Sequence, residues 1–232
     1  MNEKSIVLQK IHELNKSYSA VLPWGPSEKI LAEMESLLMS YLENHPQDSE
    51  MWLKLTMVEF ISPFEDYERI EKYVTTLLEY DANNVQGLLA LAYAQRAYRG
   101  DVSDGLFVRL QRCCDIITDR ELLSMLYLAI AWYYSWYSLR DKKKHELSLL
   151  RSIDYCSEYV HNYELLGRLY LKTGREVEGK KMIQHALANI RKIYGENYSS
   201  VDVTDINEFF NEFFKGTHIT PPNLESLREL LD

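Results

Sequence analysis

The sequence predicts an all-α protein made of antiparallel helix pairs that stack on one another. Apolar residues recur at spacings of three and four, as between Ile30 and Leu42, and no long run alternates apolar with polar residues. Glycine and proline are scarce, at nine and six of 232 residues, and most of them fall at breaks between apolar segments. The breaks leave helices of about 12 to 20 residues, an ordinary length in globular proteins.

A pattern of two large residues and one small residue recurs along the chain. Its copies begin at residues 52, 88, 125 and 163, so the intervals are 36, 37 and 38 residues, and the small residues are Thr56, Ala92, Ala129 and Gly167. Glycine costs about 1 kcal/mol relative to alanine inside a helix. We therefore interpret Gly167 as a point where a second helix comes close, at the short end of the usual ~8–10 Å interaxial distance.

The repeat predicts how the chain is organised, because a single helix pair cannot bury its apolar face alone. We expect one domain over residues 1–232, in which the first helix runs from about Glu3 to Tyr18 and the second begins after an N-cap at Ser27. Gly174 suits the left-handed end of a helix. The expected parts are a divergent pair in 1–48, repeats in 49–84, 85–121, 122–159 and 160–199, and capping helices in 200–232.

Two segments leave alternatives open. Residues 122–139 carry no charge, but their Ser, Tyr and Trp content favours a buried helix over a membrane-spanning one. The Phe-rich segment 205–214 and the Leu-rich segment 224–231 fit a cap that closes the end of the stack. They also fit a docking or dimerising helix.

At its last repeat the sequence resembles a tetratricopeptide repeat. The residues that match the family pattern are Tyr163, Leu166, Gly167, Tyr170, Gly174, Gly179, Ile183, Ala186 and Leu187. The other copies are degenerate, and their intervals exceed the period of about 34 residues typical of the family. The resemblance implies a right-handed superhelical stack of about five helix pairs, a TPR-like α-solenoid with a divergent C-terminal cap. It also implies a concave groove that binds protein.

The resemblance further implies that first-helix residues outside the packing pattern line the concave face. Position by position, this selects Lys54, Met57, Leu89, Tyr93, Arg96, Ile130, Tyr133, Tyr134, His161, Arg168 and Lys172. Aromatic and cationic side chains together suit an acidic or carboxylate-ended peptide. The Asn residues with which related proteins clamp a peptide C-terminus are absent. For any one of these residues the alternative is an ordinary solvated surface, and Tyr133 and Tyr134 also fit a helix that is buried all round.

Charge and motifs exclude several classes of function. Lys plus Arg number 26 and Asp plus Glu 35, so the net charge is −9, which argues against a general nucleic-acid binder. The three cysteines form no CxxC pair, and the N-terminus lacks the pattern of a signal peptide, so we expect a reducing, cytoplasmic location. The sequence contains no HExxH, GxSxG, Walker or GxGxxG motif, and we expect no enzyme activity, metal or cofactor.

Two functions remain open. The first is a protein–protein interaction module that binds a peptide or partner protein in the concave groove. The alternative is a bacterial immunity or antitoxin protein that neutralises a basic, nuclease-like toxin through its acidic surface.

Overall fold

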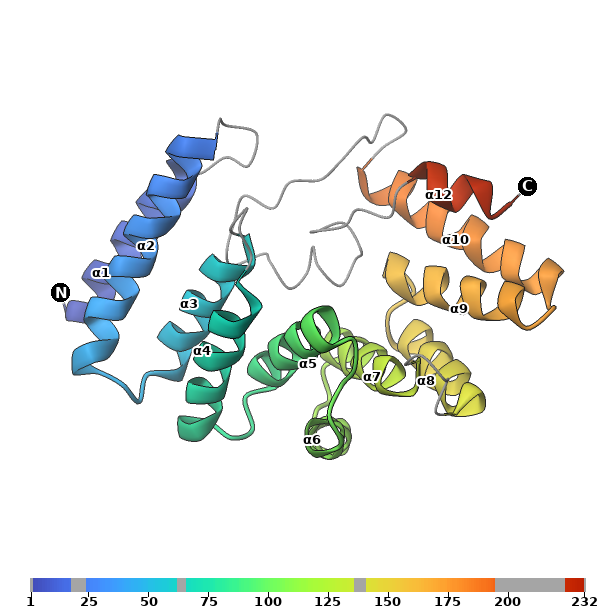
Figure 1. Cartoon of the computed structure of the whole chain (residues 1–232), viewed down its shortest axis with the longest axis horizontal. Helices are drawn as coiled ribbons and strands as arrows, with labels where there is room; N and C mark the ends of the chain where they lie inside the picture. The colour runs from blue at the N-terminus through green and yellow to red at the C-terminus, as the bar shows by residue number, and fades with distance from the viewer. Residues whose placement is uncertain (1, 18–23, 62–65, 136–140, 195–223, 232) are drawn as a thin grey trace. The chain divides into compact units, whose positions relative to one another are not determined.

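The computed structural model describes residues 2–17, 24–61, 66–135, 141–194 and 224–231. Within these ranges the chain forms helices and no strand, so the all-α prediction is confirmed (Figure 1). The chain divides into two compact units, with the boundary between Tyr98 and Arg99. Because each unit is described by itself, one domain over residues 1–232 stays a prediction, as does the handedness of a superhelix.

Unit 1 contains the first four helices and nearly all of the fifth, and successive helices from α1 to α4 pack on one another. Their buried apolar side chains include Met34, Leu38, Leu55, Ile70 and Leu77. Phe60 of α3 contacts Tyr93 of α5, with ring centroids 5.2 Å apart. The helices are α1 (Glu3–Ser17), α2 (Trp24–Asn44), α3 (Ser49–Ile61), α4 (Tyr67–Tyr80) and α5 (Val85–Arg99).

The start of α2 differs from the prediction. The helix begins at Trp24, so Ser27 lies inside its first turn instead of preceding it as an N-cap. Pro26, which made this stretch read as a break, is tolerated in a first turn because its missing N–H would have no partner there.

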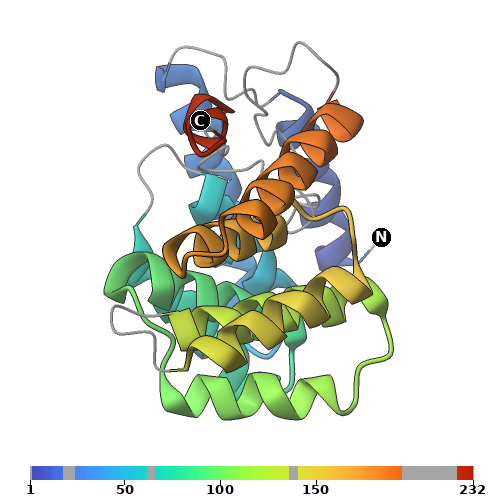
Figure 2. The same cartoon turned by 90° about the vertical axis from the view of Figure 1, so that its right-hand side faces the viewer.

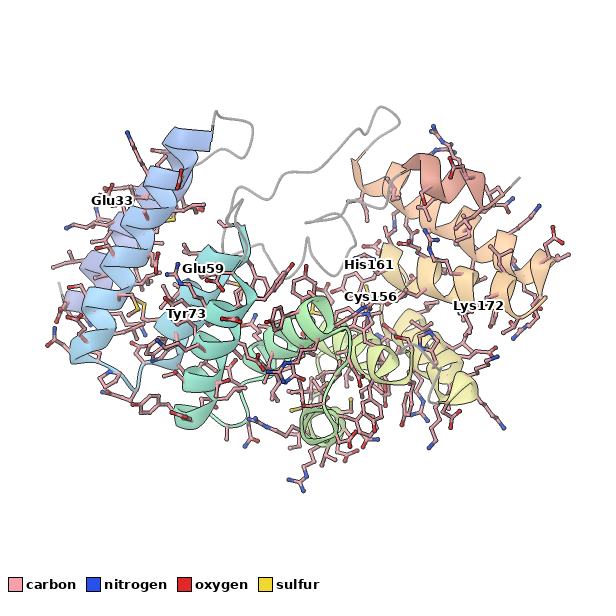
Figure 3. The ribbon with its side chains drawn as sticks, viewed as in Figure 1. Glu33, Glu59, Tyr73, Cys156, His161 and Lys172 are labelled. Atoms are coloured by element: carbon pink, nitrogen blue, oxygen red, sulfur yellow. The ribbon has the colours of Figure 1, made fainter. Side chains whose placement is uncertain are left out.

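A carboxylate network with one buried member joins three helices of unit 1. Glu59 of α3 is only 5% exposed, and its Oε1 lies 3.2 Å from Nη2 of Arg69 on α4. Arg69 also pairs with Glu35 of α2 and donates to the hydroxyl of Tyr73 at 3.0 Å. Figure 3 labels two members of this network, Glu59 on α3 and Tyr73 on α4. Burial raises the pKa of Glu59 to about 7, and the charge of Asp66 adds to the rise.

Unit 2 contains antiparallel helix pairs that lie side by side in both views (Figures 1 and 2). The pairs are α7 with α8 and α9 with α10. Helix α6 also packs on α7, and α8 packs on α9, so each pair stacks on its neighbour. Ala129 is fully buried, as are Ala92 and Thr56 in unit 1, so the recurring small residues all lie in the core. The helices are α6 (Asp104–Cys114), α7 (Arg120–Ser135), α8 (Lys142–Tyr155), α9 (Val160–Lys172), α10 (Glu176–Tyr194) and α12 (Leu224–Glu229).

The interpretation of Gly167 as a close-approach point is confirmed. A Cβ atom at this position would lie 2.7 Å from Cδ1 of Ile183 and 3.1 Å from the carbonyl oxygen of Gly179, both on α10. Gly174 has φ 79°, its N–H donates to the carbonyl of Leu171 at 3.2 Å, and the next N–H donates to that of Tyr170 at 2.9 Å. These are the two hydrogen bonds of a Schellman motif, the left-handed helix end expected there.

Helix α12 packs against α10. Leu227 of α12 is fully buried and joins the cluster formed by Val160, Tyr163, Ile183 and their neighbours on α9 and α10. The burial of Leu227 covers part of the apolar face of α9 and α10, and the capping role of 200–232 stays a prediction. The predicted Phe-rich helix at 205–214 lies outside the described residues.

The uncharged segment in the third predicted repeat belongs mostly to α7. Residues 123–126 and 128–132 of this helix are buried. Among the helices described, none combines the length and the hydropathy needed to cross a bilayer.

Candidate protein-binding groove

A groove of about 540 Å³ runs along unit 2 between α6 and α8, with α7 as its floor. The second helices of two consecutive predicted pairs therefore form the walls, and the first helix of the later pair lies between them. The lining residues are Gln111 and Cys114 of α6 and its C-cap Asp115, Tyr127, Ile130 and Tyr134 of α7, and Lys144, Leu147, Ser148 and Arg151 of α8.

Buried hydrogen bonds hold α7 and α8 in register beneath the groove. Ser124 donates to the carbonyl of Ser152 at 2.8 Å, and the hydroxyl of Ser152 donates to the carbonyl of Ser124 at 2.6 Å. Further along, Nδ1 of the buried His145 lies 2.8 Å from the carbonyl of Ala131. Asp141 caps α8 by accepting from the backbone N–H of Lys144 at 3.0 Å. Two polar contacts at separate points of a helix pair resist sliding, so the floor and one wall of the groove are preformed.

Two cation–tyrosine pairs project from this framework. The guanidinium of Arg151 lies 5.4 Å from the ring centroid of Tyr127, and its Nη1 donates to that hydroxyl at 3.5 Å. The ammonium of Lys144 lies 5.7 Å from the ring centroid of Tyr134. The two tyrosines are seven residues apart on α7 and the two cations seven apart on α8, so the pairs are equivalent in an antiparallel register.

The hydroxyl of Tyr127 is a hydrogen-bond donor in the groove. Burial raises the pKa of this phenol, and the nearby Cys114 adds to the rise, so the hydroxyl keeps its proton at neutral pH. It accepts from Arg151, and within the described ranges no acceptor takes its own proton. The ring is held by stacking on Tyr155, with centroids 5.6 Å apart.

The middle of the groove is apolar. Ile130 is buried in the floor, and on the α8 wall Leu147 is 47% exposed. Leu150 continues the wall outward and is 42% exposed. Leu147 and Leu150 thus add exposed apolar area beside the aromatic side chains.

The thiol in the groove is not activated. Burial raises the pKa of Cys114 to about 12, with Cys113 and Asp115 adding to the rise, so the group stays a thiol. A nucleophilic cysteine needs the opposite shift. In the ranges that the structure describes, no three His, Cys, Asp or Glu side chains gather to hold a metal ion.

Of the residues predicted from the third repeat, the structure brings Ile130 and Tyr134 into the groove. Tyr133 points elsewhere: it stacks on Phe107 with centroids 3.9 Å apart, and its hydroxyl donates to Asp104 at 2.9 Å. Its role is to tie α7 to α6.

The residues predicted from the fourth repeat lie on α9, outside the groove. Figure 3 shows His161 and Lys172 near opposite ends of this helix. Burial alone would raise the pKa of Glu164, but the hydrogen bond from His161 and the charge of Arg168 outweigh it and lower the pKa. Arg168 contacts Glu164 at 2.9 Å and donates to Ser226 of α12 at 3.4 Å. Lys172 is exposed.

The residues predicted from unit 1 divide into two groups. Lys54, Tyr93 and Arg96 are half-buried. Met57 and Leu89 are 3% and 0% exposed, which corrects their expected place on an accessible face. The reason is that α3 and α5 bury side chains around most of their circumference. Positions outside the repeat's packing pattern therefore also lie in the core of these two helices.

Sequence reasoning missed Tyr127, Lys144, Leu147 and Arg151. A signal was present, because the two tyrosines and the two cations each recur after seven residues, which is two helical turns. Which cation of α8 lies against which tyrosine of α7 depends on how the two helices are aligned, and the sequence alone does not give that alignment.

Comparison with known proteins shows the fold. No family model and no curated protein matches the sequence. Solved structures match over most of the chain: a MamA RS-1 double mutant gives a TM-score of 0.62 at 10% identity, covering 84% of this chain and 99% of that one. MamA 41-end from Desulfovibrio magneticus RS-1 gives 0.57 at 11% identity over 85% and 99%. The thermophilic TPR protein TTC0263 of Thermus thermophilus gives 0.51 at 18% identity over 82% and 93%. The chain has a tetratricopeptide-repeat-like fold built of helix pairs.

Proposed function

We propose that this chain is a protein–protein interaction module that binds a short segment of a partner protein in the groove formed by α6, α7 and α8. The observation that carries the proposal is the half-exposed Leu147, set between two cation–tyrosine pairs over a groove of about 540 Å³. Tyr and Arg are enriched among the residues that dominate binding energy at protein interfaces. Leu147 adds apolar area that a bound segment would remove from water.

The preformed floor favours a segment that inserts into it. A segment that binds a ready-made groove loses only its own conformational freedom, whereas a groove that forms on binding would add to the entropy cost. Helix-in-groove recognition uses apolar anchors at helical spacing, and a wall that is itself a helix offers contacts with that spacing.

The first-helix residues predicted to line a face are the second candidate, and each unit carries its own set. Lys54, Tyr93 and Arg96 in unit 1, and His161, Arg168 and Lys172 in unit 2, retain some exposure. These residues offer cations and one aromatic ring. Arg168 already donates a hydrogen bond to Ser226.

The immunity-protein alternative and the cytoplasmic location stay predictions. The net charge of −9 suits a basic toxin. The groove is less suited to a basic toxin, because the charged residues of its described lining are Lys144 and Arg151 against the single acid Asp115. A basic toxin would therefore bind another surface.

Selection from a random peptide library displayed on phage tests the proposed function. Peptides enriched on the full chain are expected to lose at least about tenfold in affinity for Leu147→Glu, because a charge replaces the apolar anchor. Val177→Glu is the matched control, since Val177 is an exposed apolar residue on α10, outside the groove. Peptides that bind wild type and Leu147→Glu equally would contradict the proposal.

A further inference from the structure

The two cation–tyrosine pairs lie at the two ends of one apolar strip. Helical rise is about 1.5 Å per residue, so seven residues separate Lys144 from Arg151 by about 10 Å along α8. Leu147 and Ser148 lie between them on the same wall, and Ile130 lies between the two tyrosines on the floor. The order along the groove is therefore cation, apolar contact, cation.

The Arg151 end offers unused donors. Within the described part of the chain no carboxylate pairs with its guanidinium, which contacts the ring and hydroxyl of Tyr127 and partly offsets the rise in the pKa of the nearby Cys114. A guanidinium carries five N–H donors, and the proton of the Tyr127 hydroxyl adds another beside it. Convergent donors of this kind fit the two oxygens of a carboxylate.

The Lys144 end is weaker and also cationic. Its ammonium lies 3.7 Å from Asp141 on the same helix, an exposed contact of the kind that contributes little energy. The side chain of Lys144 remains 61% exposed. Among the described lining residues Asp115 is the one acid, so these residues carry net positive charge in a chain whose net charge is −9.

We infer that the groove selects an acidic amphipathic segment, with two carboxylates about 10 Å apart on either side of an apolar side chain. This inference rests on the proposed function and specifies its partner. A helical segment provides that spacing with Asp or Glu at positions seven apart, and with Leu or a similar residue between them, on the same face. Arg151 and Tyr127 take one carboxylate, Lys144 takes the other, and the apolar side chain contacts Leu147 and Ile130.

Charge reversal on both partners tests the inference. The probe is a labelled helical peptide with two Glu seven residues apart and Leu between them, and its affinity for the full chain is measured by fluorescence anisotropy. Arg151→Glu and Lys144→Glu are each expected to weaken binding by about tenfold, and the double variant by more. A peptide with Lys in place of both Glu is expected to reverse the preference and bind the double variant best.

Lys143→Glu is the matched control, because Lys143 is exposed on the same helix but does not line the groove. It makes the same charge change and is expected to alter binding less than about threefold, since screened charges outside the site act weakly. Equal, Leu147-dependent binding of the Glu and Lys peptides would overturn the charge preference and leave the proposed function standing. If no peptide binds in a Leu147-dependent way, both fall.

Discussion

Replacing Gly167 with valine is expected to lower the free energy of unfolding by about 3 kcal/mol or more, the upper range for an overpacked core. The first added carbon would lie 2.7 Å from Cδ1 and 2.9 Å from Cγ1 of Ile183. That side chain is fully buried in the cluster shared with α12, so it has little room to turn away. The carbonyl oxygen of Gly179, 3.1 Å from the added atom, belongs to the backbone of α10. Relief therefore requires α9 and α10 to move apart.

Urea unfolding followed by circular dichroism measures this loss. Gly105→Val is the matched control, because Gly105 also lies in a helix and nothing is within 4 Å of a Cβ added there. Its stability is expected to stay within about 0.5 kcal/mol of wild type, as for exposed substitutions in general. A Gly167→Val protein as stable as Gly105→Val would show that the two helices do not approach as closely as the structure has them.

The stability of the protein is expected to fall by up to about 3 kcal/mol as pH rises from 4.5 to about 7, because of Glu59. The pKa of its carboxyl is raised from 4.5 to about 7 in the folded chain, first by burial and then by the charge of Asp66. Between those values the folded state binds a proton that the unfolded state has released, so stability decreases with rising pH. The contact with Arg69 at 3.2 Å offsets part of this cost once the carboxylate ionises.

Glu59→Gln removes the titrating group while keeping its shape. This variant is expected to lose most of the slope of stability against pH in that window, and to be the more stable protein above pH 7. Glu79→Gln, on the exposed side of α4, is the control and should keep the slope of wild type. Urea midpoints measured across the pH window decide the question. An unchanged slope in Glu59→Gln would contradict the assignment of the pH dependence to this residue.

The helix pairs and their contact points could be predicted from the sequence because they depend on spacing along one helix. A buried stripe repeats with the helical period, and a small residue within it marks where a neighbour comes close, as Gly167 and Ala129 do. The left-handed end at Gly174 likewise follows from a local preference of glycine for positive φ.

The binding surface could not be predicted in the same way, because the exposure of a side chain depends on which other helices pack around its own helix. Met57 and Leu89 occupy positions that the repeat pattern leaves over, yet neighbouring elements cover them. The groove also depends on the offset between α7 and α8, which the hydrogen bonds of Ser124 with Ser152 and of His145 with Ala131 set. Only that offset places Arg151 on Tyr127 and Lys144 on Tyr134.

Amide hydrogen exchange of the full chain, with and without a peptide selected from the library, tests the groove most directly. We expect the bound peptide to slow exchange in α6, α7 and α8, between residues 104 and 155, and to leave α3, α5 and α9 unchanged. Slowed exchange confined to α3, α5 and α9, the helices that carry Lys54, Tyr93 and Arg168, would contradict the groove and assign binding to the face predicted from the first helices.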